Sequence, residues 1–163
     1  DAIVLTNMLG MMNGCAVAMA GMKAQGGGRI WNMEGFGSNG QKADNLAVYG
    51  ATKRGLTYFT ESLIKDQKGQ SVSVCFLSPG IVKTDLLIDD YAGMPEEFEK
   101  AKKFFNILGD EVDTVTPALA DGILADHKNG DRVAWLTSGK AAGRFFKTFV
   151  LRQKRDLFSD VTV

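Results

Sequence analysis

Tyr49 and Lys53 are the side chains of this sequence whose types and spacing best suit proton transfer. Residues four apart project from one face of a helix, so a helix here would place a phenol beside an ammonium group. A neighbouring cation favours the phenolate form of a tyrosine, which lets the hydroxyl exchange a proton at neutral pH. The same spacing is common in helices, where an exposed pair is the usual outcome, so the flanking segments must decide.

The elements around this pair predict a parallel crossover. Arg29–Met33 and Ser71–Leu77 have the pattern of buried strands, and a helix from about Val48 to Asp66 lies between them. Strand, helix and strand in this order give two parallel strands. Ligands of such sheets bind beyond the carboxyl ends of the strands, so we expect the segments Asn32–Ser38 and Ser78–Thr84 to meet the start of the helix in one cleft.

The segment from Gly35 to Gly40 matches the pattern G-x-G-x-x-G and follows a predicted strand. A dinucleotide-binding loop opens directly into an apolar-periodic helix, whereas residues 41–45 are polar and aperiodic. We therefore interpret this segment as an active-site loop, with phosphate contact as the alternative.

The first apolar run, Ala2–Met22, contains no charged residue and is long enough for a membrane helix. Its glycines and the amides of Asn7 and Asn13 make it only mildly hydrophobic, so we expect a long buried helix of an α/β domain instead. Its methionines are typical of a helix–helix contact, either within one subunit or between subunits. Asn7 is then a buried amide, which needs hydrogen-bond partners.

The C-terminal half continues with helices and one strand. The apolar residues of 86–105 predict either a helical hairpin or a lid over an apolar substrate. A helix to about Asp126 and a strand, Arg132–Leu136, follow. The segment Gly143–Arg155 has a basic face opposite an aromatic one, which favours a docked terminal helix over a membrane-surface helix.

Composition narrows the class of protein. The 163 residues are 45% hydrophobic and have a net charge of zero, which predicts one globular domain over 1–163 and gives no basic surface for nucleic acid. Cys15 and Cys75 lie in apolar runs, so we expect reduced core thiols in a cytoplasmic protein. His127, the single histidine, follows a predicted helix, so neither a His-based triad nor a metal site is expected.

Four elements together resemble the C-terminal two-thirds of a short-chain dehydrogenase/reductase. In chain order they are Thr6-Asn7-x-x-Gly10, the strand ending at Asn32, Tyr49-x-x-x-Lys53 and Pro79-Gly80-x-x-x-Thr84. Within that superfamily the segments 32–38, 47–50 and 78–87 are most similar to the chlorophyll(ide) b reductases. The resemblance implies an α/β, Rossmann-like, three-layer doubly wound parallel sheet, with about three strands present and the N-terminal cofactor-binding third absent.

The resemblance also implies an activity, the transfer of hydride between NAD or NADP and a carbonyl or alcohol of an apolar substrate. Tyr49 would exchange the proton of the substrate oxygen, Lys53 would assist it and hold the nicotinamide ribose, and Asn7 would anchor a relay water. The implied cofactor contacts are Tyr49, Lys53, Pro79, Gly80, Ile81 and Thr84. The implied substrate contacts are Gly35, Phe36, Leu86 and Leu87.

Two departures from the family pattern bear on function. Gly35 stands where most members have a serine, and Ser38 is the nearest hydroxyl that could replace it. The glycine-rich turn and the residue that selects NAD or NADP are not in this sequence, so the choice between them stays open. The first strand then has an unpaired edge, which favours association.

We therefore expect a homo-oligomer formed through the helices at 2–22 and 48–66. A non-catalytic scaffold that keeps the fold is the alternative function. A Ser38 hydroxyl near the Tyr49 phenol would favour catalysis, and one facing solvent would favour the scaffold.

Overall fold

The structure is a computed structural model that describes residues 2–163. Its contacts divide the chain into two compact units. The first unit runs up to Ser78 and includes Ala125–Val133, and the second comprises Pro79–Leu124 and Ala134–Val163. Each unit is described by itself below, and the single domain expected over 1–163 stays a prediction.

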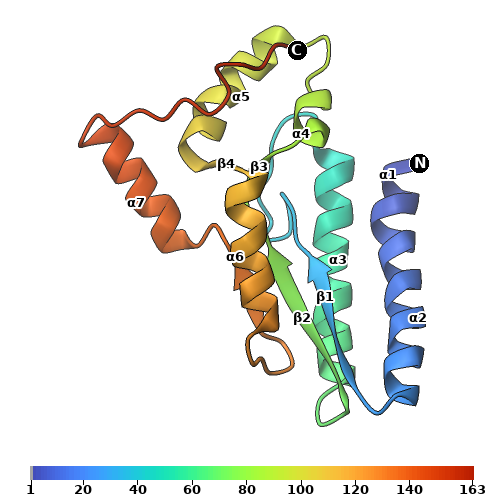
Figure 1. Ribbon diagram of the computed structural model, residues 1–163. Helices are drawn as coiled ribbons and strands as arrows, with labels where there is room; N and C mark the ends of the chain where they lie inside the picture. Colours follow the sequence, from blue (N-terminus) through green and yellow to red (C-terminus); the bar gives the residue numbers. More distant parts are fainter. Residues whose placement is uncertain (1) are drawn as a thin grey trace. The chain divides into compact units, whose positions relative to one another are not determined.

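The first unit begins with a continuous helical run of three parts, α1 (Ala2–Val4), the π-helix η1 (Leu5–Gly10) and α2 (Met11–Ala24) (Figure 1). With a mean hydropathy of 1.5, the run is long and apolar enough to cross a membrane, a test that core helices of soluble proteins also pass. The expectation of a long buried helix is wrong for the residues described. Only 6% of its most apolar window is buried, because the run packs along one side and leaves the others exposed.

The predicted crossover is confirmed. β1 (Gly28–Met33) is followed by α3 (Ala47–Asp66) and by β2 (Val72–Ser78), and the two strands pair in parallel from Gly28↔Val72 to Met33↔Leu77. β5 (Arg132–Ala134) completes the strand order β1-β2-β5. β1 is therefore an edge strand of this sheet, as expected.

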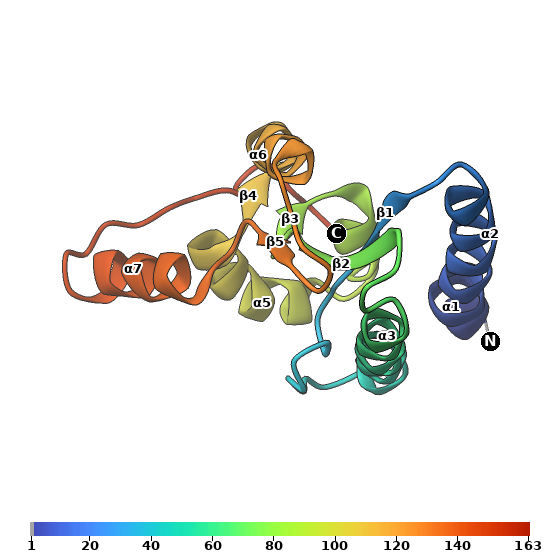
Figure 2. The same ribbon diagram turned by 90° about the horizontal axis from the view of Figure 1, so that it is seen from below.

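The core of the first unit lies where α2 and α3 cover one face of β1 and β2. Cys15, Ile30, Val72 and Val74 are buried there, and apolar side chains of both helices pack around them. Those surrounding side chains are Met11, Ala18, Met19, Met22, Phe59, Leu63 and Ile64. In Figure 2, α2 and α3 are seen nearly end-on as two separate helices. Burying this stripe fixes the start of α3 next to the carboxyl end of β1.

The second unit contains two very short strands that the sequence pattern did not reveal. β3 (Val82–Lys83) pairs in parallel with β4 (Asp110–Glu111), and two residues are too few to show an alternating pattern. Between them lie α4 (Asp85–Asp89) and α5 (Pro95–Leu108), and α6 (Val112–Leu124) follows β4. The helices expected between residues 86 and 105 are therefore present, with Pro95 in the first turn of α5.

The last helix, α7 (Ser138–Phe149), begins and ends earlier than the predicted Gly143–Arg155. Thr137 caps its N-terminus by accepting a hydrogen bond from the Lys140 amide, and this cap sets the earlier start. The helix is docked on α5 through the ring contact of Phe145 with Phe104, while Phe149 is exposed.

An aromatic cluster fills the interior of the second unit. Phe158, which is 0% exposed, contacts Phe98 and Phe105, and Tyr91 contacts the same two rings. The side chain of Asn106 accepts hydrogen bonds from the backbone amides of Leu157 and Phe158. The C-terminal segment is thereby part of the core of this unit.

Phe158→Ala should lower the free energy of unfolding by about 3–5 kcal/mol, because it empties a buried aromatic position. The measurement is urea unfolding followed by circular dichroism. Phe146→Ala is the matched control: that ring is 56% exposed, and its removal should change stability by less than about 0.5 kcal/mol. Equal effects of the two substitutions would contradict the structure of the C-terminal segment.

Candidate functional site

Tyr49 and Lys53 lie one helical turn apart at the start of α3 and share one face, as the sequence predicts. The Lys53 Nζ atom lies over the Tyr49 ring, 5.7 Å from its centroid. Both side chains are half-buried. The phenol and the ammonium group are therefore neighbours, and neither side chain is fully buried.

Both side chains reach the backbone of Gly35, in the segment that leaves β1. A Cβ atom placed on Gly35 would lie 2.7 Å from the Tyr49 hydroxyl oxygen and 2.9 Å from Cε of Lys53. The Tyr49 hydroxyl and the Lys53 side chain thus occupy the space that a side chain at position 35 would fill. A serine in the usual family position would have to displace one of them.

The loop after β1 is held against α3 by a second close approach. Gly37 has φ of +93°, and a Cβ atom on it would lie 2.6 Å from Cα of Gly50. The Ser38 carbonyl accepts hydrogen bonds from Arg54 and from Thr57 of α3. No helix follows this loop directly, since α3 starts only at residue 47, so the loop fits the active-site interpretation better than a phosphate loop.

Ser38 is buried at 7% exposure, and its hydroxyl accepts a hydrogen bond of 3.1 Å from the Gly35 amide. Its side chain thus turns back toward the backbone that the Tyr49 hydroxyl touches, and away from solvent. A role of Ser38 in place of the family serine stays a prediction. The neighbouring Phe36 is half-buried.

Lys53 has a distinctive electrostatic position. Burial lowers the pKa of its ammonium group, and among residues 2–163 it forms no ion pair. A cavity of ≈ 10 Å³, lined in part by Lys53, Asn32 and Ser38, adjoins it. A half-buried cation without a carboxylate partner suits hydrogen bonding to ribose hydroxyls, so the donors present fit the sugar of a nicotinamide cofactor.

Asn7 differs from the expectation of a buried amide, because it is only half-buried. Its side-chain nitrogen donates to the Thr52 hydroxyl at 3.2 Å, and that hydroxyl donates to the Tyr49 carbonyl at 2.6 Å. Asn7 is therefore linked through Thr52 to the backbone of Tyr49, and its role in anchoring a relay water for Lys53 stays a prediction. Sequence reasoning missed Thr52, although a hydroxyl three positions after Tyr49 was a visible signal.

Asn32 joins three elements of the first unit. It is buried, its Oδ1 accepts from the Cys15 thiol at 3.2 Å, and its amide nitrogen donates to Thr60 at 3.0 Å. Burial raises the pKa of Cys15 and of Cys75, and both thiols are free, as predicted for core cysteines. No three His, Cys, Asp or Glu side chains are placed to hold a metal anywhere in 2–163.

The predicted contacts at the nicotinamide end of the cofactor, which run from Pro79 to Thr84, belong to the second unit. The Thr84 hydroxyl caps α4 by accepting from the Leu87 amide, and Leu86 is 74% exposed. Their meeting with Tyr49 in one cleft stays a prediction.

A comparison with protein families identifies the family of the chain. The family model described as short chain dehydrogenase matches residues 1–94, which is more than half of the chain. A solved short-chain dehydrogenase/reductase of unknown function from Caenorhabditis elegans, with cofactor, has a TM-score of 0.60 at 20% identity, covering 83% of this chain and 55% of that one. The chain belongs to the short-chain dehydrogenase family, and its fold is the α/β fold with a parallel sheet.

Within the family the chain is similar to the chlorophyll(ide) b reductases. It is 35% identical over 164 residues to Chlorophyll(ide) b reductase NOL, chloroplastic, of Arabidopsis thaliana, covering 96% of this chain and 46% of the relative. It is also 35% identical over 136 residues to Probable chlorophyll(ide) b reductase NYC1, chloroplastic, of Oryza sativa subsp. japonica, covering 83% and 26%. The chain thus spans less than half the length of these relatives. The expectation of a cytoplasmic protein is contradicted, because these relatives are chloroplastic.

Gly35→Ala should reduce turnover of a nicotinamide coenzyme by about 100-fold, since an added methyl group would push the Tyr49 hydroxyl or the Lys53 stem away by an ångström or so. The assay uses the protein expressed from its complete reading frame. Gly14→Ala in α2, where a Cβ atom meets nothing within 4 Å, is the control and should keep full turnover. Undiminished turnover in Gly35→Ala would show that the close contact at position 35 is unimportant.

Proposed function

We propose that this chain carries the proton-transfer and substrate part of an NAD- or NADP-dependent oxidoreductase that interconverts a carbonyl and an alcohol. The meeting of the Tyr49 hydroxyl and the Lys53 side chain at Gly35 is the observation that carries the proposal. The bound nicotinamide would supply or accept the hydride at the substrate carbon. The residues of this chain would handle the proton and the orientation of the substrate.

Tyr49 acts as general acid in the reductive direction, donating its proton to the substrate oxygen, and as general base in the reverse direction. The positive charge of Lys53, held beside the ring, stabilises the phenolate left behind. The same ammonium group holds the nicotinamide ribose by hydrogen bonds. Ser38, buried beside Gly35, orients the substrate oxygen in place of the family serine.

The names of the relatives extend the proposal to substrate and location. The relatives are named chlorophyll(ide) b reductases, which makes chlorophyll(ide) b a candidate for the expected apolar substrate. We propose a substrate of this class and a location in the chloroplast. The scaffold alternative is less well supported, because Ser38 turns toward Gly35 instead of toward solvent.

Tyr49→Phe, in the protein expressed from its complete reading frame, should abolish reduction of chlorophyllide b while leaving coenzyme affinity nearly unchanged, because the substitution removes the hydroxyl that donates the proton and keeps the ring. Lys53→Ala should impair both turnover and coenzyme affinity, since that side chain serves both. The measurements are coenzyme oxidation and a coenzyme binding titration. Tyr58→Phe, on the same helix but 75% exposed, is the control. Full activity in Tyr49→Phe would overturn the mechanism.

The apolar surface of α2 and α3 supports a second proposal, a homo-oligomer formed through these helices. A groove of ≈ 440 Å³ runs between them, and its lining is largely apolar. The lining residues are Met12, Cys15, Ala16, Met19, Ala20, Lys23, Phe59, Leu63 and Gln67. A second copy presenting the same pair of helices would cover it.

Ala16→Glu should shift the protein toward monomer, because a carboxylate would then be buried in the contact at Ala16, which is exposed in the single chain. Sedimentation velocity measures the change. Ala142→Glu, an exposed position of α7, is the control and should leave the mass unchanged. A monomeric parent protein would refute the proposed contact.

A further inference from the structure

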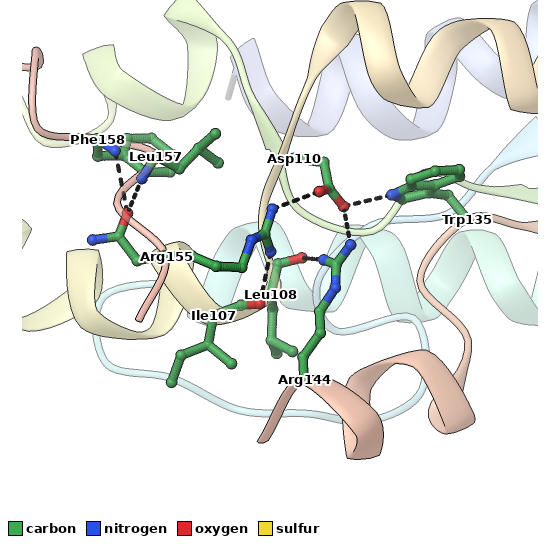
Figure 3. A network of polar contacts seen from close by, with 9 residues as sticks. Ile107, Leu108, Asp110, Trp135, Arg144, Arg155, Leu157 and Phe158 are labelled. Carbon is green, nitrogen blue, oxygen red and sulfur yellow. Dashed lines mark hydrogen bonds and ion pairs between the residues drawn. The ribbon is translucent and has the colours of Figure 1, made fainter. Parts of the chain in front are cut away.

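Asp110 is the most heavily bonded carboxylate of the second unit (Figure 3). It is 5% exposed and accepts hydrogen bonds from Trp135 Nε1 at 2.6 Å, Arg144 at 2.7 Å and Arg155 at 2.7 Å. Burial by itself would raise the pKa of this carboxyl, but the hydrogen bonds from Trp135 and Arg144, with Arg155 beside them, hold the pKa below its usual range. Asp110 is therefore a charged acceptor at neutral pH.

Both guanidinium groups also bind the backbone that leads to Asp110. Arg144 donates to the Leu108 carbonyl at 2.8 Å, and Arg155 donates to the Ile107 carbonyl at 3.0 Å. The end of α5 and the start of β4 are thus held by two side chains from distant parts of the sequence. Charge-assisted hydrogen bonds of this kind are the stronger ones in proteins.

This cluster is linked to the segment 79–84, which the family resemblance predicts to contact the cofactor. The backbone amide of Asp110 donates to the Ile81 carbonyl at 3.1 Å, and Val82 pairs with Asp110 in the β3–β4 ladder. A Cβ atom on Gly109 would lie 3.5 Å from Cγ2 of Ile81, so the side chain of Ile81 also rests against this backbone. The hydrogen bonds to the Asp110 side chain therefore hold in place the residue whose backbone amide binds Ile81.

A second link runs through Trp135. Leu136, the next residue, packs against Gly80, where an added Cβ atom would lie 2.5 Å from Cβ of Leu136 and where φ is +74°. The Gly80–Ile81 segment is therefore held by residues adjacent to two members of the cluster. Strands of two residues provide little order of their own, so the side-chain cluster must supply it.

We propose that Asp110 is a positioning residue, which holds the backbone at Gly80 and Ile81 in the shape that receives the nicotinamide end of the cofactor. The inference rests on the proposed function. A role in folding alone would lower stability without a specific effect on the coenzyme. A positioning role would affect the KM for coenzyme more than kcat, because this loop is the predicted cofactor contact and the proton-transfer residues lie elsewhere.

The test is Asp110→Asn in the protein expressed from its complete reading frame, with Asp121→Asn as the control, since Asp121 is an exposed carboxylate of α6. We expect the KM for coenzyme to rise about tenfold, with kcat changed less than about threefold, because the charge that both arginines bond is removed. Hydrogen exchange of the Ile81 to Thr84 amides should speed up in Asp110→Asn and not in Asp121→Asn. Trp135→Phe removes one hydrogen-bond donor and keeps the carboxylate, so it should give a smaller rise in the KM for coenzyme and a smaller increase in hydrogen exchange. This variant replaces Asp110→Asn in the test if Asp110→Asn does not fold.

A loss of thermal stability with an unchanged KM for coenzyme and unchanged exchange at Ile81 to Thr84 would overturn the inference, since the cluster would then only stabilise the fold. Failure of the proposed function appears separately, as an absence of coenzyme binding by the unsubstituted protein. That result would overturn both, whereas intact binding by the parent with unchanged affinity in the variants would overturn this inference alone.

Discussion

The close approach of the loop after β1 to the first turns of α3 is the constraint on which the candidate site depends. Two glycines permit it, because Gly37 lies against Gly50 and Gly35 lies against the ends of Tyr49 and Lys53. A side chain at Gly37 would separate the loop from the helix, and one at Gly35 would displace the Tyr49 hydroxyl or the Lys53 side chain. Gly35, which stands where most family members have a serine, belongs to this close packing. The same packing places Ser38, the proposed substitute, beside Gly35.

Lys53 shows how the site reconciles burial with charge. Removing an ammonium group from water lowers its pKa, and among the described residues no carboxylate compensates. The Lys53 ammonium group lies 5.7 Å from the centroid of the Tyr49 ring, and this cation–π contact favours its position beside the phenol. An unpaired cation costs stability, and functional sites are where such costs are retained.

In the second unit, the strands β3 and β4 are too short to hold a loop by themselves. Side chains from the C-terminal half do so, through the guanidinium groups around Asp110 and through the aromatic cluster around Phe158. The ion pair of Lys83 with Asp160, at 2.8 Å, ties β3 to the same C-terminal segment. That segment is therefore a structural part of the unit that bears the predicted cofactor loop.

Much of the fold was predictable from the sequence, because the elements of the first unit carry long hydrophobic patterns and clear turn residues. The strands β1 and β2, the helix α3 and the Tyr49–Lys53 pair follow from periodicity and spacing, which are local properties. The bounds of α7 and the strands β3 and β4 did not follow, since a cap or a two-residue ladder leaves no periodic pattern. The prediction of a cytoplasmic location was wrong, because composition and reduced cysteines do not distinguish compartments of similar redox state.

The sequence by itself determined which groups are available for chemistry, a tyrosine and a lysine four residues apart with a hydroxyl nearby. Only the tertiary structure decided where those groups meet, at Gly35, and that Asn7 bonds to Thr52. The same holds for Asp110, whose three donors lie 25, 34 and 45 residues away along the chain. Contacts of that kind depend on how elements pack in space, and the local pattern of a sequence carries no record of them.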